Sequence, residues 1–172
     1  REHKIMHFET ANESWQNGFG GPQGVAELRW MTKYLNDRTN ILVAASAPDI
    51  AWSKAYLDVT YTDPAQITEA MRLAANGGAD LIAYLGHGNS RVFGATAPRL
   101  LDQTSIQQWT GNVVLLPITC TTNWFVNNEP GYRSLPVQGL TQPQGGIAAS
   151  IACTTYMLSE QNTEFYIELL KQ

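Results

Sequence analysis

The sequence predicts a single α/β domain in which a mostly parallel sheet carries helices on both faces, giving three layers. Apolar runs of strand length alternate with helical patterns along the 172 residues. Several of these runs are apolar throughout, which is typical of strands covered on both faces. The hydrophobic content is 44% and the charged content only 15%, so we expect one globular domain over residues 1–172.

The expected elements follow in chain order. Strand-like runs lie at residues 4–11, 41–47, 55–62, 80–86, 112–120 and 145–154. Residues 22–36 carry apolar side chains at helical spacing after Pro22. A second helix is expected at 63–78, with Asp63 as its N-cap and Pro64 in its first turn. Shorter helices are expected at 99–109 and 133–140, and a helix at 159–172 closes the chain.

Composition excludes several classes of function. The net charge is −4 without a run of Lys or Arg, which disfavours nucleic acid and anionic membranes as partners. No apolar stretch approaches the length of a membrane span. No Gly-rich loop has a nucleotide-binding pattern, and no cofactor is expected. The chain begins at Arg1 without a signal peptide, so we expect a piece excised from or associated with a longer chain, and a composition rich in Asn, Gln and Thr favours an exported protein.

Polar residues follow three of the predicted strands at the points where the strands end. Asn12 and Glu13 follow the first strand, His87 follows the run "DLIAYLG", and Cys120 follows the run "NVVLLPIT". In parallel α/β sheets, ligands bind beyond the carboxyl ends of the strands. An acid, an imidazole and a thiol are therefore expected at one edge of one sheet.

Cys120 and His87 have complementary chemistry. A free thiol is mostly protonated at neutral pH, so a histidine that accepts its proton raises the reactive fraction. Gly86 and Gly88 flank the histidine and let a substrate carbonyl approach the backbone. The amides of Gly88 and Cys120 would then form an oxyanion hole for a tetrahedral intermediate.

The segments "NGGADLIAYLGHGNS", "LPITCTTNWF" and "GGIAASIACTTY" resemble the catalytic region of the gingipain-type cysteine peptidases of the caspase-like clan. The likeness covers roughly residues 4–13 and 54–172, and residues 37–53 look like an insertion. His87 precedes Cys120 by 33 positions (120 − 87), against about 50 in caspases. The resemblance implies a caspase-like, flavodoxin-like fold and a cysteine endopeptidase that works through a thioester acyl-enzyme.

Carried over residue by residue, the resemblance implies that Cys120 is the nucleophile and His87 the general acid/base. Glu13 would orient the imidazole as a third member, with Glu27 as the alternative. Glu13 is equally well explained as a solvated loop acid, and a Cys-His dyad alone suffices in caspase-like enzymes. Cys153 lies in an expected buried strand and is interpreted as a core residue.

The substrate pocket is expected to be bordered by Thr154, Thr155 and Tyr156, while Trp124 either covers the thiol or anchors its loop. No acid lies in "SWQNGFGGPQG" or in "ACTTYML", so we expect a pocket with a neutral base for a small or uncharged residue. Glu129 precedes a Pro-Gly turn that is expected to hold it at the surface.

No metal is expected. His3 and His7 have no third ligand, and calcium is only an association of the family. The expected partners are a protein or peptide substrate and another subdomain or subunit of the same precursor. The alternatives to a peptidase are a catalytically silent module of the same fold and a transpeptidase, in which an amine intercepts the acyl-enzyme.

Overall fold

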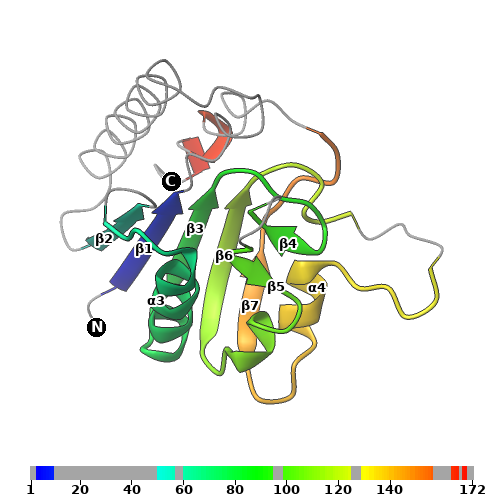
Figure 1. Cartoon of the computed structure of the whole chain (residues 1–172), viewed down its shortest axis with the longest axis horizontal. Helices are drawn as coiled ribbons and strands as arrows, with labels where there is room; N and C mark the ends of the chain where they lie inside the picture. The colour runs from blue at the N-terminus through cyan, green and yellow to red at the C-terminus, as the bar shows by residue number, and fades with distance from the viewer. Residues whose placement is uncertain are drawn as a thin grey trace.

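The computed structural model describes residues 3–9, 50–56, 60–94, 99–124, 129–156, 164–166 and 168–169. Within these ranges, five strands form a parallel sheet in the order β2-β1-β3-β6-β7. They are β1 (His3–Glu9), β2 (Ile50–Tyr56), β3 (Leu81–Leu85), β6 (Asn112–Ile118) and β7 (Gly146–Ser150). Figure 1 shows β1, β3 and β6 side by side, with their arrowheads at the same end of the sheet. This strand order is that of flavodoxin-like folds, and the predicted α/β class is confirmed.

Helical segments lie on both faces of the sheet, as predicted. The helix α3 (Pro64–Asn76) covers one face with a buried stripe at helical spacing. The stripe consists of Ile67, Ala70, Met71, Ala74 and Ala75. On the opposite face, Tyr166 and Leu169 from the helical residues 164–166 and 168–169 pack on side chains of β3 and β6. The sheet is therefore buried from both sides.

The start of α3 matches its sequence signals. The Asp63 side chain accepts a hydrogen bond from the Ala65 amide at 2.9 Å, and the Gln66 side chain accepts one from the Asp63 amide at 3.2 Å. This reciprocal pair is a capping box, with Pro64 in the first turn. The predicted N-cap is confirmed.

A group of short elements packs on the same face as α3 (Figure 1). It comprises β4 (Val92–Phe93), β5 (Leu101–Asp102), the 3₁₀ turn η1 (Ile106–Gln108) and α4 (Leu135–Leu140). The helix α4 was predicted, but the predicted helix at 99–109 is wrong. The Asp102 carboxylate accepts hydrogen bonds from the amides of Thr104 at 3.0 Å and Ser105 at 2.8 Å, and such a local turn competes with helix formation.

Two predicted strands have different bounds in the structure. The strand expected at 55–62 overlaps β2 (Ile50–Tyr56) only at its start, and the described part of β2 pairs with β1 from His3 to Glu9. The strand expected at 145–154 is β7, which ends at Ser150. The helix at 22–36 and the strand at 41–47 lie outside the described residues, as does most of the predicted insertion at 37–53.

Pro117 explains why β7 stops early. The Ile151 amide still donates to the Leu115 carbonyl at 3.3 Å, so the next ladder bond would run from residue 117 to the Ile151 carbonyl. Proline has no N–H, and the bond cannot form. The Ile151 carbonyl instead accepts the hydroxyl of Tyr166 at 2.6 Å. The chain beyond Ile151 is thereby released from the sheet.

Among the residues that the structure describes, no helix has both the length and the apolar character needed to cross a bilayer.

Candidate active site

His87 and Cys120 follow neighbouring strands at the same register. Leu85 at the end of β3 pairs with Ile118 at the end of β6, and the amide of Gly86 donates to the Ile118 carbonyl at 3.4 Å. His87 and Cys120 each stand two residues beyond this last pair. The backbone therefore brings positions 87 and 120 to the same edge of the sheet, as the sequence predicted.

The last strand residues before the two positions share one face of the sheet. Side chains alternate along a strand, and Ala83 and Leu85 of β3 share one buried cluster with Leu116 and Ile118 of β6. Leu85 and Ile118, the last pair before the site, therefore lie on the same face. The residues at positions 87 and 120 are both partly exposed.

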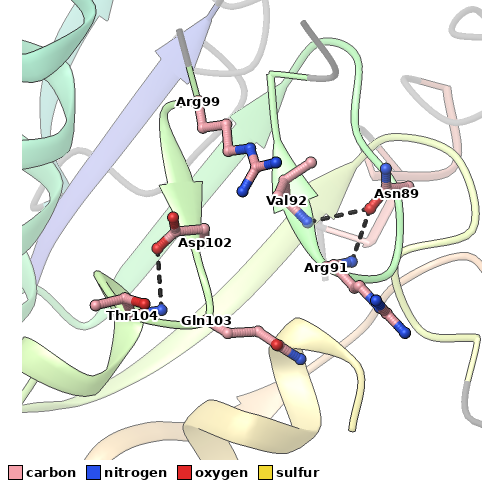
Figure 2. Close-up of a pocket in the computed structure, with 7 residues that line it drawn as sticks. All are labelled: Asn89, Arg91, Val92, Arg99, Asp102, Gln103 and Thr104. Atoms are coloured by element: carbon pink, nitrogen blue, oxygen red, sulfur yellow. Dashed lines mark hydrogen bonds between the residues drawn. The ribbon is translucent and has the colours of Figure 1, made fainter. Parts of the chain in front are cut away.

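A short hairpin follows His87 and folds back onto it. The Asn89 amide donates to the Val92 carbonyl at 2.9 Å, and the Gly94 amide donates to the His87 carbonyl at 2.7 Å. Gly94 has a φ of 75°, which a residue with a side chain adopts only under strain. The Asn89 side chain closes the turn by accepting the amides of Arg91 and Val92, drawn as dashed lines in Figure 2.

Gly88 lies where the His87 hairpin meets the residue before Cys120. A Cβ on Gly88 would stand 2.8 Å from the hydroxyl oxygen of Thr119 and 3.0 Å from the Val92 carbonyl oxygen, so only glycine fits without a shift. Gly88 and Phe93 form the non-hydrogen-bonded pair of the hairpin, which turns the Gly88 amide away from β4. That amide donates to no residue that the structure describes.

The loop after Cys120 is held in an unusual conformation. Thr121 has a φ of 45°, and such a left-handed conformation is rare for a β-branched residue. The Thr121 amide donates to the Thr155 carbonyl at 3.0 Å, and the Asn123 amide donates to the Cys153 carbonyl at 2.9 Å. The chain that Pro117 releases from the sheet thus pairs with the loop that carries Cys120.

The sequence profile of peptidase family C25 matches residues 3–172. The chain belongs to peptidase family C25. No curated protein sequence matches it.

Solved structures resemble this C25 chain in fold. The Arg-specific cysteine proteinase gingipain R matches with a TM-score of 0.60 and 18% identity, over 96% of this chain and 37% of that one. The complex of the pro- and mature domains of RgpB from Porphyromonas gingivalis matches with a TM-score of 0.61 and 19% identity, over 98% and 37%. A structure titled only as a protease matches with a TM-score of 0.52 and 14% identity, over 66% and 23%. The chain thus spans about a third of the length of the gingipain chains that it resembles.

The predicted pocket residues of the C25 chain lie along the released segment and the Cys120 loop. Thr154, Thr155 and Tyr156 are exposed, with 86% of Tyr156 accessible, and 48% of Trp124 is accessible. Because residues 121–123 bond to residues 153–155, the structure brings Trp124 close to the segment that carries the other three. Their role as a pocket stays a prediction.

The remaining predicted residues divide into two groups. Glu13 and Glu27 lie outside the described residues. Cys153 is described, and its placement in a buried strand is wrong, because it is half-buried three residues beyond the end of β7. Burial and, to a smaller extent, the charge that Cys153 can carry raise the pKa of the Tyr166 hydroxyl.

A polar pocket of about 360 Å³ lies beside the His87 hairpin and contains no predicted site residue (Figure 2). Charged side chains that line this pocket interact with neighbouring residues. Arg91 pairs with Glu129 and stands over the Tyr132 ring at 5.2 Å. Burial alone would raise the pKa of Asp102, but hydrogen bonds from Ser105 and Thr104 and the charge of Arg99 hold that pKa below its usual value.

Two features of the site were missed by the sequence analysis. Nothing in the sequence around Thr121 indicates its positive φ, since this conformation accompanies hydrogen bonds to residues more than thirty positions away. Tyr84 was taken as one more apolar residue of its strand, yet its hydroxyl donates to the His87 carbonyl at 2.7 Å. The phenol in an otherwise apolar run was the available signal for Tyr84, because a buried hydroxyl needs a partner.

Proposed function

We propose that the chain carries the catalytic machinery of a cysteine endopeptidase, with Cys120 as the nucleophile and His87 as the general acid/base. The register of β3 and β6 is the observation that supports this proposal most, because His87 and Cys120 each follow by two residues the last pair of these strands, Leu85 and Ile118, at one edge of the sheet. Membership of peptidase family C25 supports the same chemistry.

The proposed reaction proceeds in two steps. His87 takes the proton of the Cys120 thiol, and the thiolate attacks the peptide carbonyl to form a tetrahedral intermediate. His87 then donates the proton to the leaving amine, and a thioester remains on Cys120. Water, deprotonated by His87, attacks the thioester and releases the carboxylate product and the thiol.

The negative charge on the tetrahedral intermediate needs hydrogen-bond donors. We assign this role to the backbone amides of Gly88 and Cys120. The geometry around Gly88 supports its part, since its amide is turned away from the hairpin and a side chain at this position would collide with Thr119. Glu13 stays the predicted partner that orients His87. In the sequence, Glu13 is four residues beyond the end of β1.

We propose that the substrate lies in extended form along residues 151–156. The backbone of the substrate would hydrogen-bond to backbone groups of this segment, which is no longer part of the sheet. The pocket at this segment is expected to take a small or uncharged residue. Glu129 is 62% exposed and paired with Arg91, which supports its assignment as a surface residue rather than the base of a cation pocket.

The chain spans about a third of the gingipain chains that resemble it, so the working enzyme is proposed to include further parts of a precursor. A complex between pro- and mature domains exists for RgpB, and we expect an equivalent neighbouring subdomain as a partner here. Export from the cell is part of this proposal.

The experiment is labelling with peptidyl acyloxymethyl ketones that differ in their terminal residue. Cys120→Ala should abolish labelling and peptide cleavage, whereas the matched variant Cys153→Ala should keep both. His87→Ala should lower kcat by orders of magnitude without loss of fold. If wild type and Cys120→Ala are labelled equally, the nucleophile lies elsewhere and the proposal fails.

A further inference from the structure

Tyr84 is a fully buried tyrosine that reaches the backbone of the candidate acid/base. It is the fourth residue of β3, and its ring stacks on Phe93 with centroids 4.3 Å apart and planes within 3°. None of its surface is exposed. The stack holds the phenol between the end of β3 and the returning strand β4 of the His87 hairpin.

The Tyr84 hydroxyl makes two hydrogen bonds at the base of this hairpin. It donates to the His87 carbonyl at 2.7 Å and accepts the Gly94 amide at 3.1 Å. The Gly94 amide also donates to the His87 carbonyl at 2.7 Å. The carbonyl and the amide therefore satisfy each other without the tyrosine, and a phenylalanine would leave neither unpaired.

The His87 carbonyl belongs to the same peptide plane as the Gly88 N–H. In a trans peptide these two bonds point in opposite directions. Holding the carbonyl against Tyr84 and Gly94 thus directs the Gly88 N–H to the other side, away from β4. The orientation of one peptide plane determines where the proposed oxyanion donor points.

We propose that Tyr84 is a positioning residue for the oxyanion hole, fixing the His87–Gly88 peptide plane so that the Gly88 amide faces the developing oxyanion. This inference rests on the proposed function and adds a residue to it that acts through the backbone. The hydroxyl gives the carbonyl a second bond besides the one from Gly94 and so restricts the rotation of the plane further. This restriction matters because an oxyanion donor acts only when it is already aimed at the oxyanion.

The test compares Tyr84→Phe with Tyr166→Phe in the purified protein. Both variants remove a buried hydroxyl that donates to a backbone carbonyl, at His87 in one case and at Ile151 in the other. Loss of an oxyanion donor lowers kcat about 100- to 1,000-fold, and misdirecting it should cost less, about 10- to 100-fold. We expect this fall in kcat for Tyr84→Phe, with KM within about twofold of wild type.

Two reagents that react with the thiol distinguish a defect in the oxyanion hole from a general loss of order at the site. A peptide aldehyde, carrying the terminal residue preferred in a substrate library, forms a hemithioacetal whose oxygen occupies the oxyanion position. Iodoacetamide alkylates the thiol by displacement and forms no oxyanion there. Tyr84→Phe should weaken aldehyde binding in parallel with kcat and leave the alkylation rate unchanged.

Each outcome is decisive. Wild-type kcat and wild-type aldehyde binding in Tyr84→Phe would overturn the positioning role, while Cys120→Ala and His87→Ala would still report on the proposed function. Equal losses in alkylation and in aldehyde binding would also overturn it, since they would place the defect at the thiol. If wild type neither cleaves peptides nor reacts at Cys120, the proposed function itself fails.

Discussion

The two loops that carry His87 and Cys120 leave neighbouring strands at the same register, yet they are held in different ways. The His87 hairpin is supported by its own sequence neighbourhood, since Tyr84, Asn89 and Gly94 all lie within seven residues of the histidine. The Cys120 loop is held by the carbonyls of Cys153 and Thr155, more than thirty residues away. The proposed acid/base is thus positioned locally, and the proposed nucleophile is positioned by the segment proposed to bind substrate.

This difference has a functional consequence. A substrate that lies along residues 151–156 would contact the same segment that holds the Cys120 loop through Thr121 and Asn123. Binding energy in the pocket can then help to align the nucleophile. The His87 hairpin needs no such help and is preorganised before substrate arrives.

The largest effect is expected from Gly88→Ala, which breaks the contact between the two loops. The added Cβ would lie 2.8 Å from the Thr119 hydroxyl oxygen and 3.0 Å from the Val92 carbonyl oxygen, so the Gly88 amide must move. We expect kcat to fall by about 100-fold and the free energy of unfolding by about 1–3 kcal/mol, measured by peptide cleavage and urea denaturation. Gly131→Ala is the control for an added Cβ without close neighbours, since no atom lies within 4 Å there, although its φ of 75° adds a backbone strain that Gly88 does not have. Wild-type kcat in Gly88→Ala would refute the close packing of the loops.

Two further variants test the left-handed backbone of the two loops. Gly94→Ala changes the His87 hairpin, and Thr121→Gly changes the Cys120 loop. Alanine at the φ of 75° of Gly94 adds strain of about 1–2 kcal/mol. Glycine at Thr121 relieves a similar strain but loses buried contacts and chain entropy, so its unfolding free energy should stay within about 1 kcal/mol of wild type. Urea denaturation of both variants checks this. If Thr121→Gly were the more destabilising of the two variants, the side chain of Thr121 would contribute more to stability than its strained φ costs.

Alkaline pH should lower the free energy of unfolding through the Tyr166 hydroxyl. Burial raises the pKa of Tyr166, whose hydroxyl donates to the Ile151 carbonyl, so the folded state retains a proton that the unfolded chain releases. Its contribution to stability is therefore complete below pH about 10 and declines as the pH rises further. Denaturation at pH 9 and pH 11 should show a smaller loss for Tyr166→Phe than for wild type. An identical loss in both proteins would exclude Tyr166 as the titrating group.

The smallest effect is expected from Glu129→Gln, at the outer side of the His87 hairpin. Glu129 pairs with Arg91 at the surface, and exposed ion pairs contribute about 0–1 kcal/mol. The melting temperature and the cleavage specificity in a positional-scanning library should stay as in wild type. A sharp wild-type preference for Arg or Lys that this variant loses would make Glu129 the base of the pocket instead.

Much of the fold was predictable because its signals are local. Asp63 and Pro64 mark the start of α3, and the apolar runs before His87 and Cys120 mark β3 and β6. The helix predicted at 99–109 failed for an equally local reason, since the Asp102 carboxylate binds the next amides before a helix can form. Pro117 was visible in the sequence, but its effect on β7 required knowledge of which strand pairs with β6.

The sequence by itself determined which residues carry the candidate chemistry, because parallel strands end at one edge and His87 and Cys120 stand just beyond two such ends. Only the tertiary structure decided how they are held. The positive φ of Thr121 and the release of residues 152–156 depend on pairing between segments far apart in the chain. The bond from Tyr84 to the His87 carbonyl depends on the path of the chain after the strand. The contacts of Thr121 and of residues 152–156 follow from the assembled sheet, and no local pattern of residues encodes them.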